Sequence, residues 1–142
     1  MQQVVVDSSV IVKWLNQQNE KDLKQAETLL KDVQHGQIDL IAPELAKYEI
    51  GNVLLVVKQL PFAQAREALE FFFSIPITFV PETQTLAEST YRIGQELNIT
   101  YYDASFLSVA EQLGAPLVTD NIKHQGKTSE MNKFFPSEIN LL

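Results

Sequence analysis

Short apolar runs alternate with longer amphipathic stretches along most of the chain. The short runs are rich in β-branched residues, which is typical of buried strands in a parallel sheet, and they fall at residues 4–6, 38–41, 77–80 and 116–119. The longer stretches carry apolar residues at helical spacing and predict helices at residues 9–15, 23–36, 43–60, 61–73, 85–97 and 101–113. This alternation predicts a three-layer α/β/α fold with a central, mainly parallel sheet.

The predicted ends of several helices coincide with residues that favour such ends. Ser8 or Ser9 can cap the first helix, and Pro43 can occupy the opening turn of the third, which Pro61 interrupts. Gly114 suits the end of the last long helix. The tail is expected to hold a short polar helix and an edge strand near residues 139–142.

Two segments are apolar on every side of their helices, namely residues 53–57 and 71–73. A helix that is apolar all round is buried all round. Extra core packing is one explanation, but a domain of this size has limited core. We therefore expect part of this surface to form a homodimer interface.

The overall composition indicates an ordinary globular chain. Its 142 residues, 45% hydrophobic and 20% charged, are expected to form a single domain over residues 1–142. The longest apolar run covers only residues 53–57, whereas a membrane helix needs about 18 or more apolar residues. The N-terminus lacks a basic region before its first apolar run, and there is no cysteine. A cytoplasmic location without membrane contact is the expectation.

Two acidic residues directly follow predicted strands. Asp7 comes after three valines, and Asp120 follows Leu117, Val118 and Thr119. In open α/β sheets the ligand crevice lies outside the carboxyl ends of the strands, so both acids are expected there. Each has a structural alternative: Asp7 could cap the following helix, and Asp120 could serve as a turn residue.

Two further acids belong to predicted helices. Glu49 shares a helical stripe with Leu45, Val53 and Val56, and a carboxylate on a buried face needs a partner, which could be a metal or a salt bridge. Asp103 follows Thr100 in a Thr-x-x-Asp pattern, so taken alone it is explained by a capping box. Together the four acids predict an oxygen-only site for Mg²⁺ or Mn²⁺, whose chemistry suits nucleases and phosphatases.

Net charge argues against a general affinity for nucleic acid, since it is −7. The most basic stretch holds Lys123, Lys127 and Lys133, with His124 among them. Lys123 and Lys127 are candidates for contacts to an RNA backbone. The alternative is that these lysines belong to a solvated C-terminal surface.

Three segments resemble the motif blocks of PIN-domain proteins, and most closely those of VapC-type toxins from toxin–antitoxin pairs. These segments are VVVDSSVIVKWL, PELAKYEIGNVL and ITYYDASFLSVAEQLGAPLVTDN. The resemblance extends from residue 3 to about residue 121, and its specificity rests on four acids in order with their flanking apolar patterns. It implies a Mg²⁺- or Mn²⁺-dependent endoribonuclease that is usually dimeric and is held inactive by an antitoxin.

The resemblance also assigns roles by position. Asp7, Glu49, Asp103 and Asp120 match the acids of the metal site in that order, with Glu49 able to act through water. Ser9 matches a hydroxyl position that orients Asp7 or a water, and Thr119 matches the polar residue before the last acid. Asn121 stands where some members carry a further acid, and this departure puts a second metal in doubt.

The combined interpretation is a metal-dependent endoribonuclease that cuts RNA phosphodiesters with an activated water, as the toxin of a toxin–antitoxin pair. A PIN-like module that only binds, with weak or no turnover, is the main alternative. A receiver-type phospho-acceptor domain is a further one, but it would need adjacent acids after the first strand, where Ser8 and Ser9 stand. A phosphatase using Asp-x-Asp is disfavoured because Ser9 occupies the second position.

Overall fold

A parallel sheet forms the centre of the molecule, as the computed structural model shows for residues 1–120 and 133–134. Within these residues five strands occur in the order β3-β2-β1-β4-β5, and every pair is parallel. Their bounds are β1 (Gln2–Val6), β2 (Ile38–Pro43), β3 (Ile77–Val80), β4 (Leu117–Val118) and β5 (Lys133–Phe134). The predicted parallel α/β sheet is therefore confirmed.

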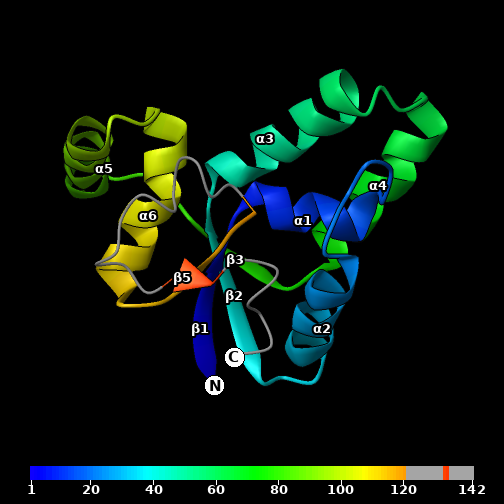
Figure 1. Ribbon diagram of the computed structural model, residues 1–142, viewed down its shortest axis with the longest axis horizontal. Helices are drawn as coiled ribbons and strands as arrows, with labels where there is room; N and C mark the ends of the chain where they lie inside the picture. The colour runs from blue at the N-terminus through cyan, green and yellow to red at the C-terminus, as the bar shows by residue number, and fades with distance from the viewer. Residues whose placement is uncertain (121–132, 135–142) are drawn as a thin grey trace.

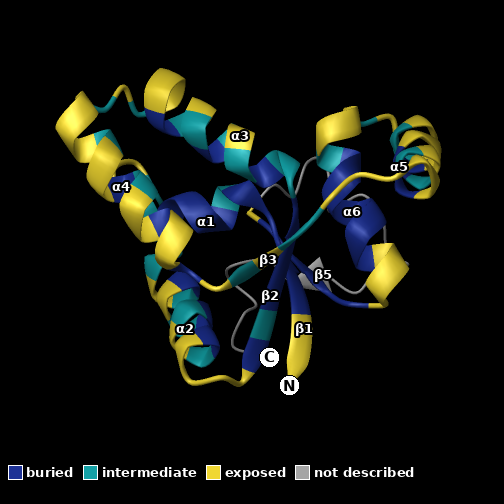
Figure 2. Cartoon of the chain, turned by 180° about the vertical axis from the view of Figure 1, so that it is seen from behind, coloured by how far each residue is buried: buried dark blue, intermediate teal, exposed yellow. Residues whose placement is uncertain are grey.

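Helices cover both faces of this sheet. Those found among the described residues are α1 (Ser8–Leu15), α2 (Leu23–Gln34), α3 (Leu45–Asn52), the π-helix η1 (Val53–Val57), α4 (Phe62–Ser74), α5 (Gln84–Leu97) and α6 (Tyr101–Leu113). Figure 1 shows α1, α2 and α4 on one side of the strands and α5 and α6 on the other. Because both faces are covered, the middles of β1 and β2 are fully buried (Figure 2), and the three-layer prediction is confirmed.

The helix boundaries agree with the sequence at most ends. Helix α6 begins after Thr100, whose side chain accepts a hydrogen bond from the Asp103 amide, and ends at Gly114, where φ is 61°. The predicted cap of α1 was wrong by one residue. The carbonyl of Asp7 already accepts from the amides of Val10 and Ile11, so Asp7 occupies the N-cap position and Ser8 begins the helix.

The helix predicted over residues 43–60 was wrong in two respects. Pro43 is the last residue of β2 and pairs with Val80 instead of opening a helix. Its missing N–H is tolerated because the pairing of β2 with β1 reaches only to Ile41. After Asn52 the α-helix widens into η1, which turns Val56 outward so that it is 57% exposed.

The tail predictions have no test in this structure, because the polar helix and the edge strand near residues 139–142 lie outside the described residues. Strand β5 was not anticipated from the sequence. Over the part of the chain that the structure describes, no helix is both long and apolar enough to cross a bilayer.

The strand order creates a switch point between β1 and β4. The chain proceeds outward from β1 through β2 to β3, then returns to place β4 on the opposite side of β1. At such a point the connections leave in opposite directions and open a crevice at the carboxyl ends of the strands. The amide of Asp7 donates to the carbonyl of Val118 at 3.0 Å, so both strand ends meet there.

Candidate metal-binding crevice

Asp7 is held rigidly at the end of β1. It is 5% exposed, and its Oδ2 accepts hydrogen bonds from Ser9 Oγ at 2.6 Å and Thr119 Oγ1 at 2.9 Å. Its side chain makes no capping hydrogen bond to α1, although the residue occupies the N-cap position. The capping alternative therefore fails for this side chain, whose carboxylate is instead fixed by hydroxyl groups from two elements.

Ser9 connects the two strand-end acids. Its Oγ donates to Asp7 and accepts a hydrogen bond from the Asp120 amide at 3.0 Å. One hydroxyl in the first turn of α1 thereby joins Asp7 to Asp120, which lies 111 positions after Ser9 in the chain. The family resemblance paired the Ser9 hydroxyl with Asp7 or a water, and the structure places this hydroxyl on Asp7. The contact of Thr119 with Asp7 was not anticipated.

Glu49 approaches the same crevice from α3. Its Oε1 accepts a hydrogen bond from Ser8 Oγ at 2.9 Å, and its carboxylate is half-buried. Burial raises the pKa of Glu49 to about 7 against the opposing effect of the Ser8 hydrogen bond, and the negative charges of Asp7 and Asp103 raise this pKa further. The salt bridges among the described residues do not include Glu49, so that alternative is not observed.

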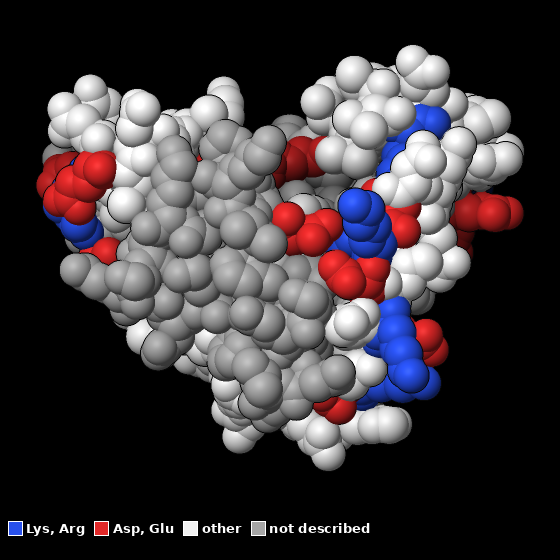
Figure 3. All heavy atoms as spheres, in the orientation of Figure 1, with Lys and Arg blue, Asp and Glu red and all other residues white. Residues whose placement is uncertain are grey.

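Asp103 reaches the crevice from the first turn of α6. This helix packs against β1, β2 and β4. The Thr100 cap shows that the capping explanation holds for the local backbone. The negative charge of Asp103 contributes to the raised pKa of Glu49, so its carboxylate acts on that side chain from the start of α6. Figure 3 shows acidic side chains inside the hollow between the two groups of helices.

Lys13 is a member of this site that was missed in the sequence. It lies on α1, its side chain is completely buried, and its Nζ stands 3.0 Å from Asp120 Oδ2. A role as a turn residue therefore does not account for the ion pair that Asp120 forms with Lys13. The sequence does contain a sign of this role, since Lys13 is a single lysine among the apolar residues of the first helix. A lysine at such a position is expected to be buried, and a buried ammonium requires a carboxylate nearby.

A charged network extends from Asp120 away from the crevice. Lys13 also contacts Glu20 Oε1 at 3.3 Å, and Glu20 Oε2 contacts Lys58 Nζ at 2.7 Å. Lys58 additionally donates to the carbonyl of Gln18. We call Lys58, Glu20, Lys13 and Asp120 the charged network. Glu20 lies in the connection between α1 and α2, so this connection supplies a central member of the network.

The donor chemistry of the four acids fits a hard divalent cation, since every candidate ligand is a carboxylate oxygen. Their arrangement does not form a ready-made cage. Among the described residues no three acidic or histidine side chains are grouped closely enough to hold an ion. Instead Asp7 is held by hydroxyl groups, Glu49 by Ser8, and Asp120 by Lys13.

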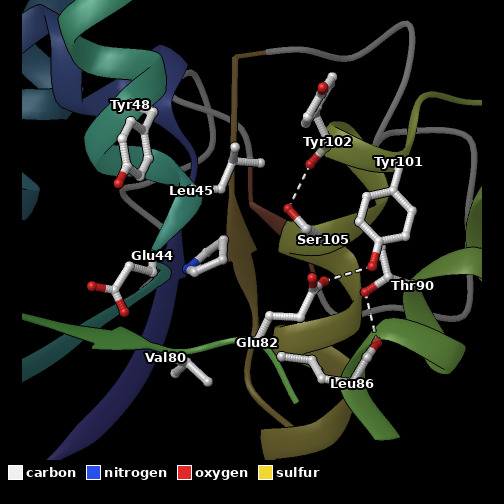
Figure 4. A pocket seen from close by; sticks show the side chains of 11 residues that line it. Glu44, Leu45, Tyr48, Val80, Glu82, Leu86, Thr90, Tyr101, Tyr102 and Ser105 are labelled. Carbon is white, nitrogen blue, oxygen red and sulfur yellow. Dashed lines mark hydrogen bonds between the residues drawn. The ribbon is translucent and has the colours of Figure 1, made fainter. Parts of the chain in front are cut away.

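An apolar pocket of about 260 Å³ opens between α3 and the pair α5 and α6. Figure 4 shows Tyr48 on one side and Tyr101 and Tyr102 on the other. Two of the pocket's lining residues, Tyr48 and Tyr102, directly precede Glu49 and Asp103 in the sequence. The hydroxyl of Tyr101 donates to Glu82 at 2.5 Å, and this hydrogen bond raises the pKa of Tyr101 to about 12.

Three predicted site residues cannot be placed. Asn121, Lys123 and Lys127 lie outside the described residues. Among the predicted residues that the structure describes, hydrogen bonds connect Asp7, Ser9, Thr119 and Asp120. Glu49 and Asp103 are related to this group by electrostatics, since the charges of Asp7 and Asp103 raise the pKa of Glu49.

The fold and the crevice define an α/β domain with carboxylates gathered around the switch point of a parallel sheet. The family model of the PIN domain matches residues 4–127. The chain therefore belongs to the PIN domain family, which confirms the resemblance found in the sequence.

Solved structures show the same fold at low sequence identity. PAE2754 from Pyrobaculum aerophilum is 23% identical with a TM-score of 0.67, covering 99% of this chain and 97% of that one. A chain of VapBC2 from Rickettsia felis, bound to a promoter DNA fragment, is 17% identical with a TM-score of 0.69, covering 94% and 98%. VapC20 from Mycobacterium tuberculosis, a toxin that cleaves the sarcin–ricin loop, is 16% identical with a TM-score of 0.61, covering 80% and 86%. No curated protein sequence matches the chain.

Proposed function

We propose that this chain is a metal-dependent endoribonuclease and the toxin of a toxin–antitoxin pair. One observation carries the proposal: the switch point joins Asp7 to Asp120 through Ser9, beside Glu49, whose pKa is about 7. Membership of the PIN domain family supports nuclease chemistry. The similar fold of an RNA-cleaving toxin and of VapBC complexes supports the toxin assignment.

In this proposal Asp7, Asp103 and Asp120 would hold one Mg²⁺ or Mn²⁺, and Glu49 would contribute directly or through water. The bound ion would polarise the phosphoryl group and stabilise the charge that develops on it. The hydroxyls of Ser9 and Thr119 fix Asp7, so the carboxylate needs little reorganisation when it binds. Asn121 belongs to the same proposed site.

Glu49 is the proposed general base. Its carboxylate would accept a proton from the water that attacks the phosphorus, while the P–O bond opposite that water breaks. A general base works best when its pKa lies near the working pH, and the burial of Glu49 moves it into that range. Ser8 donates to one oxygen and so orients the other.

The proposed partners follow from the same assignment. RNA is the substrate, with Lys123 and Lys127 as candidate backbone contacts. The exposed apolar residues of η1 and α4 offer surface for a cognate antitoxin and for a homodimer, because Leu55, Val57 and Phe62 are 71%, 69% and 82% exposed. In this proposal residues 1–142 act as one nuclease domain in the cytoplasm.

A purified-protein cleavage assay tests the proposal. Labelled RNA should be cut in Mn²⁺ or Mg²⁺ and remain intact in chelator. Cleavage that continues in excess chelator would refute metal dependence. No cleavage of any RNA in either metal, with intact fold, would favour the alternative of a PIN-like module that only binds.

A further inference from the structure

The ammonium of Lys13 occupies an environment that resembles a small cation site. Its three oxygen partners are Asp120 Oδ2 at 3.0 Å, Glu20 Oε1 at 3.3 Å and the carbonyl of Lys21 at 2.6 Å. Two of these partners are carboxylates. Lys13 is also among the largest fully buried side chains that the structure describes. The fold therefore surrounds the ammonium of Lys13 with three oxygen atoms, one of which belongs to Asp120, a proposed metal ligand.

Lys13 acts on the crevice through Asp120. The Asp120 side chain is 36% exposed, yet one of its oxygens is tied to a side chain with no exposure at all. Its backbone amide is tied to Ser9, which also holds Asp7. These two attachments limit how Asp120 can turn, so the position of its carboxylate at the switch point depends on Lys13.

The charge of Lys13 also affects how many divalent ions the crevice accepts. A second ion would use an oxygen of Asp120 together with another nearby acid, which is how paired metal sites are built. Glu20 is that acid here, and Lys13 already lies between it and Asp120. A dication placed beside the buried ammonium would meet strong repulsion, since little solvent screens it.

We propose that Lys13 is a positioning residue and the built-in cation of this site. Its ammonium holds Asp120 and fills the place of a second divalent ion, so the site binds a single one. This inference rests on the proposed function, because it treats Asp120 as a metal ligand. A purely structural lysine would stabilise the fold without influencing the number of bound ions or the rate constant of the reaction.

The number of Mn²⁺ ions bound by the wild-type chain gives the first test. Electron paramagnetic resonance measures free Mn²⁺ and needs no RNA. One ion per chain is expected, and two tightly bound ions would overturn the inference. Loss of RNA cleavage in chelator is a separate result, so failure of the inference and failure of the proposed nuclease function are distinguishable.

A comparison of two lysine variants gives the second test. Lys13→Ala should expose Asp120 and Glu20 to solvent cations and bind a second Mn²⁺, and added ethylammonium should restore the single-ion count. Lys31→Ala is the control, since Lys31 forms an exposed ion pair with Glu27 at the same 3.3 Å separation as Lys13 and Glu20. An unchanged count in folded Lys13→Ala would overturn the built-in cation.

Lys13→Met extends the test to catalysis. Methionine fills most of the buried volume of the lysine side chain, so this variant also serves if Lys13→Ala does not fold. Removal of residues that orient metal ligands lowers metal affinity or activity by about 10- to 100-fold. We expect a loss of kcat in this range for RNA cleavage, with KM changed much less. Wild-type kcat in folded Lys13→Met would show that Lys13 only supports the fold.

Discussion

The charged network and the apolar arm distribute their side chains in opposite ways. We define the apolar arm as η1 and α4, residues 53–57 and 62–74. In the charged network two lysine side chains are buried, with exposures of 0% and 4%, whereas in the arm Leu55 and Phe62 are 71% and 82% exposed. Burying charge and exposing apolar surface both oppose stability. The network has its partners within the chain, whereas the described residues leave much of the arm uncovered.

This contrast assigns the two proposed functions to different regions: RNA cleavage to the crevice beside the charged network, and contacts with an antitoxin or a second copy to the apolar arm. The network needs no other molecule, because each lysine contacts at least one carboxylate. The exposed apolar side chains of the arm contribute favourable burial free energy only when another surface covers them, which supports the proposed dimer and antitoxin contacts. Lys58 follows directly after η1, so the two regions are joined along the chain.

The largest expected change in the free energy of unfolding comes from one of two neighbouring phenylalanines in the arm. Phe72 is 1% exposed and lies edge-on to Phe79 with ring centroids 6.0 Å apart, whereas Phe73 is 63% exposed. Phe72→Ala should lower the free energy of unfolding by about 3–5 kcal/mol because it leaves a cavity. Phe73→Ala should change it by less than about 0.5 kcal/mol in the monomer. Urea unfolding at low protein concentration measures both.

A larger loss in Phe73→Ala that grows with protein concentration would show that a second copy covers the arm. Equal losses for the two variants at all concentrations would contradict the division into a buried and an exposed face.

The charged network gives the next largest effect. Lys13→Met should lower the free energy of unfolding by about 3 kcal/mol, because Asp120 and Glu20 lose the cation between them. Lys31→Met removes an exposed pair and should cost less than about 0.5 kcal/mol. Thermal or urea unfolding in chelator compares the two variants. A similar small loss in both would mean that the network does not stabilise the fold.

The raised pKa of Glu49 predicts a pH dependence of stability. The folded protein holds a proton on Glu49 up to about pH 7, whereas the unfolded chain releases it near 4.5. Stability from this group is therefore complete below pH 4.5 and is lost as the pH rises through 7. The loss should be about 1–2 kcal/mol after allowance for solvent screening of this half-buried group.

Unfolding of metal-free wild type and Glu49→Gln at about pH 5 and about pH 8 measures this contribution. Stability of the wild type should fall more steeply between these values than that of the variant. Parallel pH profiles would show that Glu49 titrates normally.

The smallest expected effect concerns the pocket beside the acids. Tyr48 is 77% exposed at its rim, and an exposed aromatic ring can stack on an RNA base for about 1 kcal/mol or more. Tyr48→Ala should therefore raise KM for RNA about fivefold, while Tyr48→Phe should not. Tyr91→Ala is a matched control because Tyr91 is 64% exposed on α5. Equal KM values for Tyr48→Ala and Tyr91→Ala would exclude a role of the pocket.

Much of the fold was predictable because local patterns decide it. The valines of β1 and the apolar run of β4 are buried on both faces, so a short uninterrupted apolar run identifies each strand. The limits of α6 follow from Thr100 and Gly114, whose preferences are local. Pro43 was misassigned because its tolerance in β2 depends on where the pairing with β1 stops, which is a property of the register.

The sequence was sufficient to select the four candidate acids, but not their hydrogen-bonding and ionic partners. Strand-end positions identify Asp7 and Asp120, and an apolar stripe identifies Glu49. Lys13 was missed because its partners lie on two separate loops, 7 and 107 positions along the chain, and no local pattern connects them. The hydroxyl groups around Asp7 were found only through the family pattern, although the structure gives a physical reason for them.

Single-turnover cleavage of labelled RNA by Asp7→Asn tests the central claim most directly. This change keeps the size of the side chain and an acceptor for Ser9 and Thr119, but it removes the charge. We predict a loss of at least about a thousandfold in rate with Mn²⁺ present and an unchanged circular dichroism spectrum. Glu88→Gln, which alters an exposed acid on α5, should cut at the wild-type rate. Wild-type cleavage by purified Asp7→Asn would contradict the assignment of the crevice as the active site.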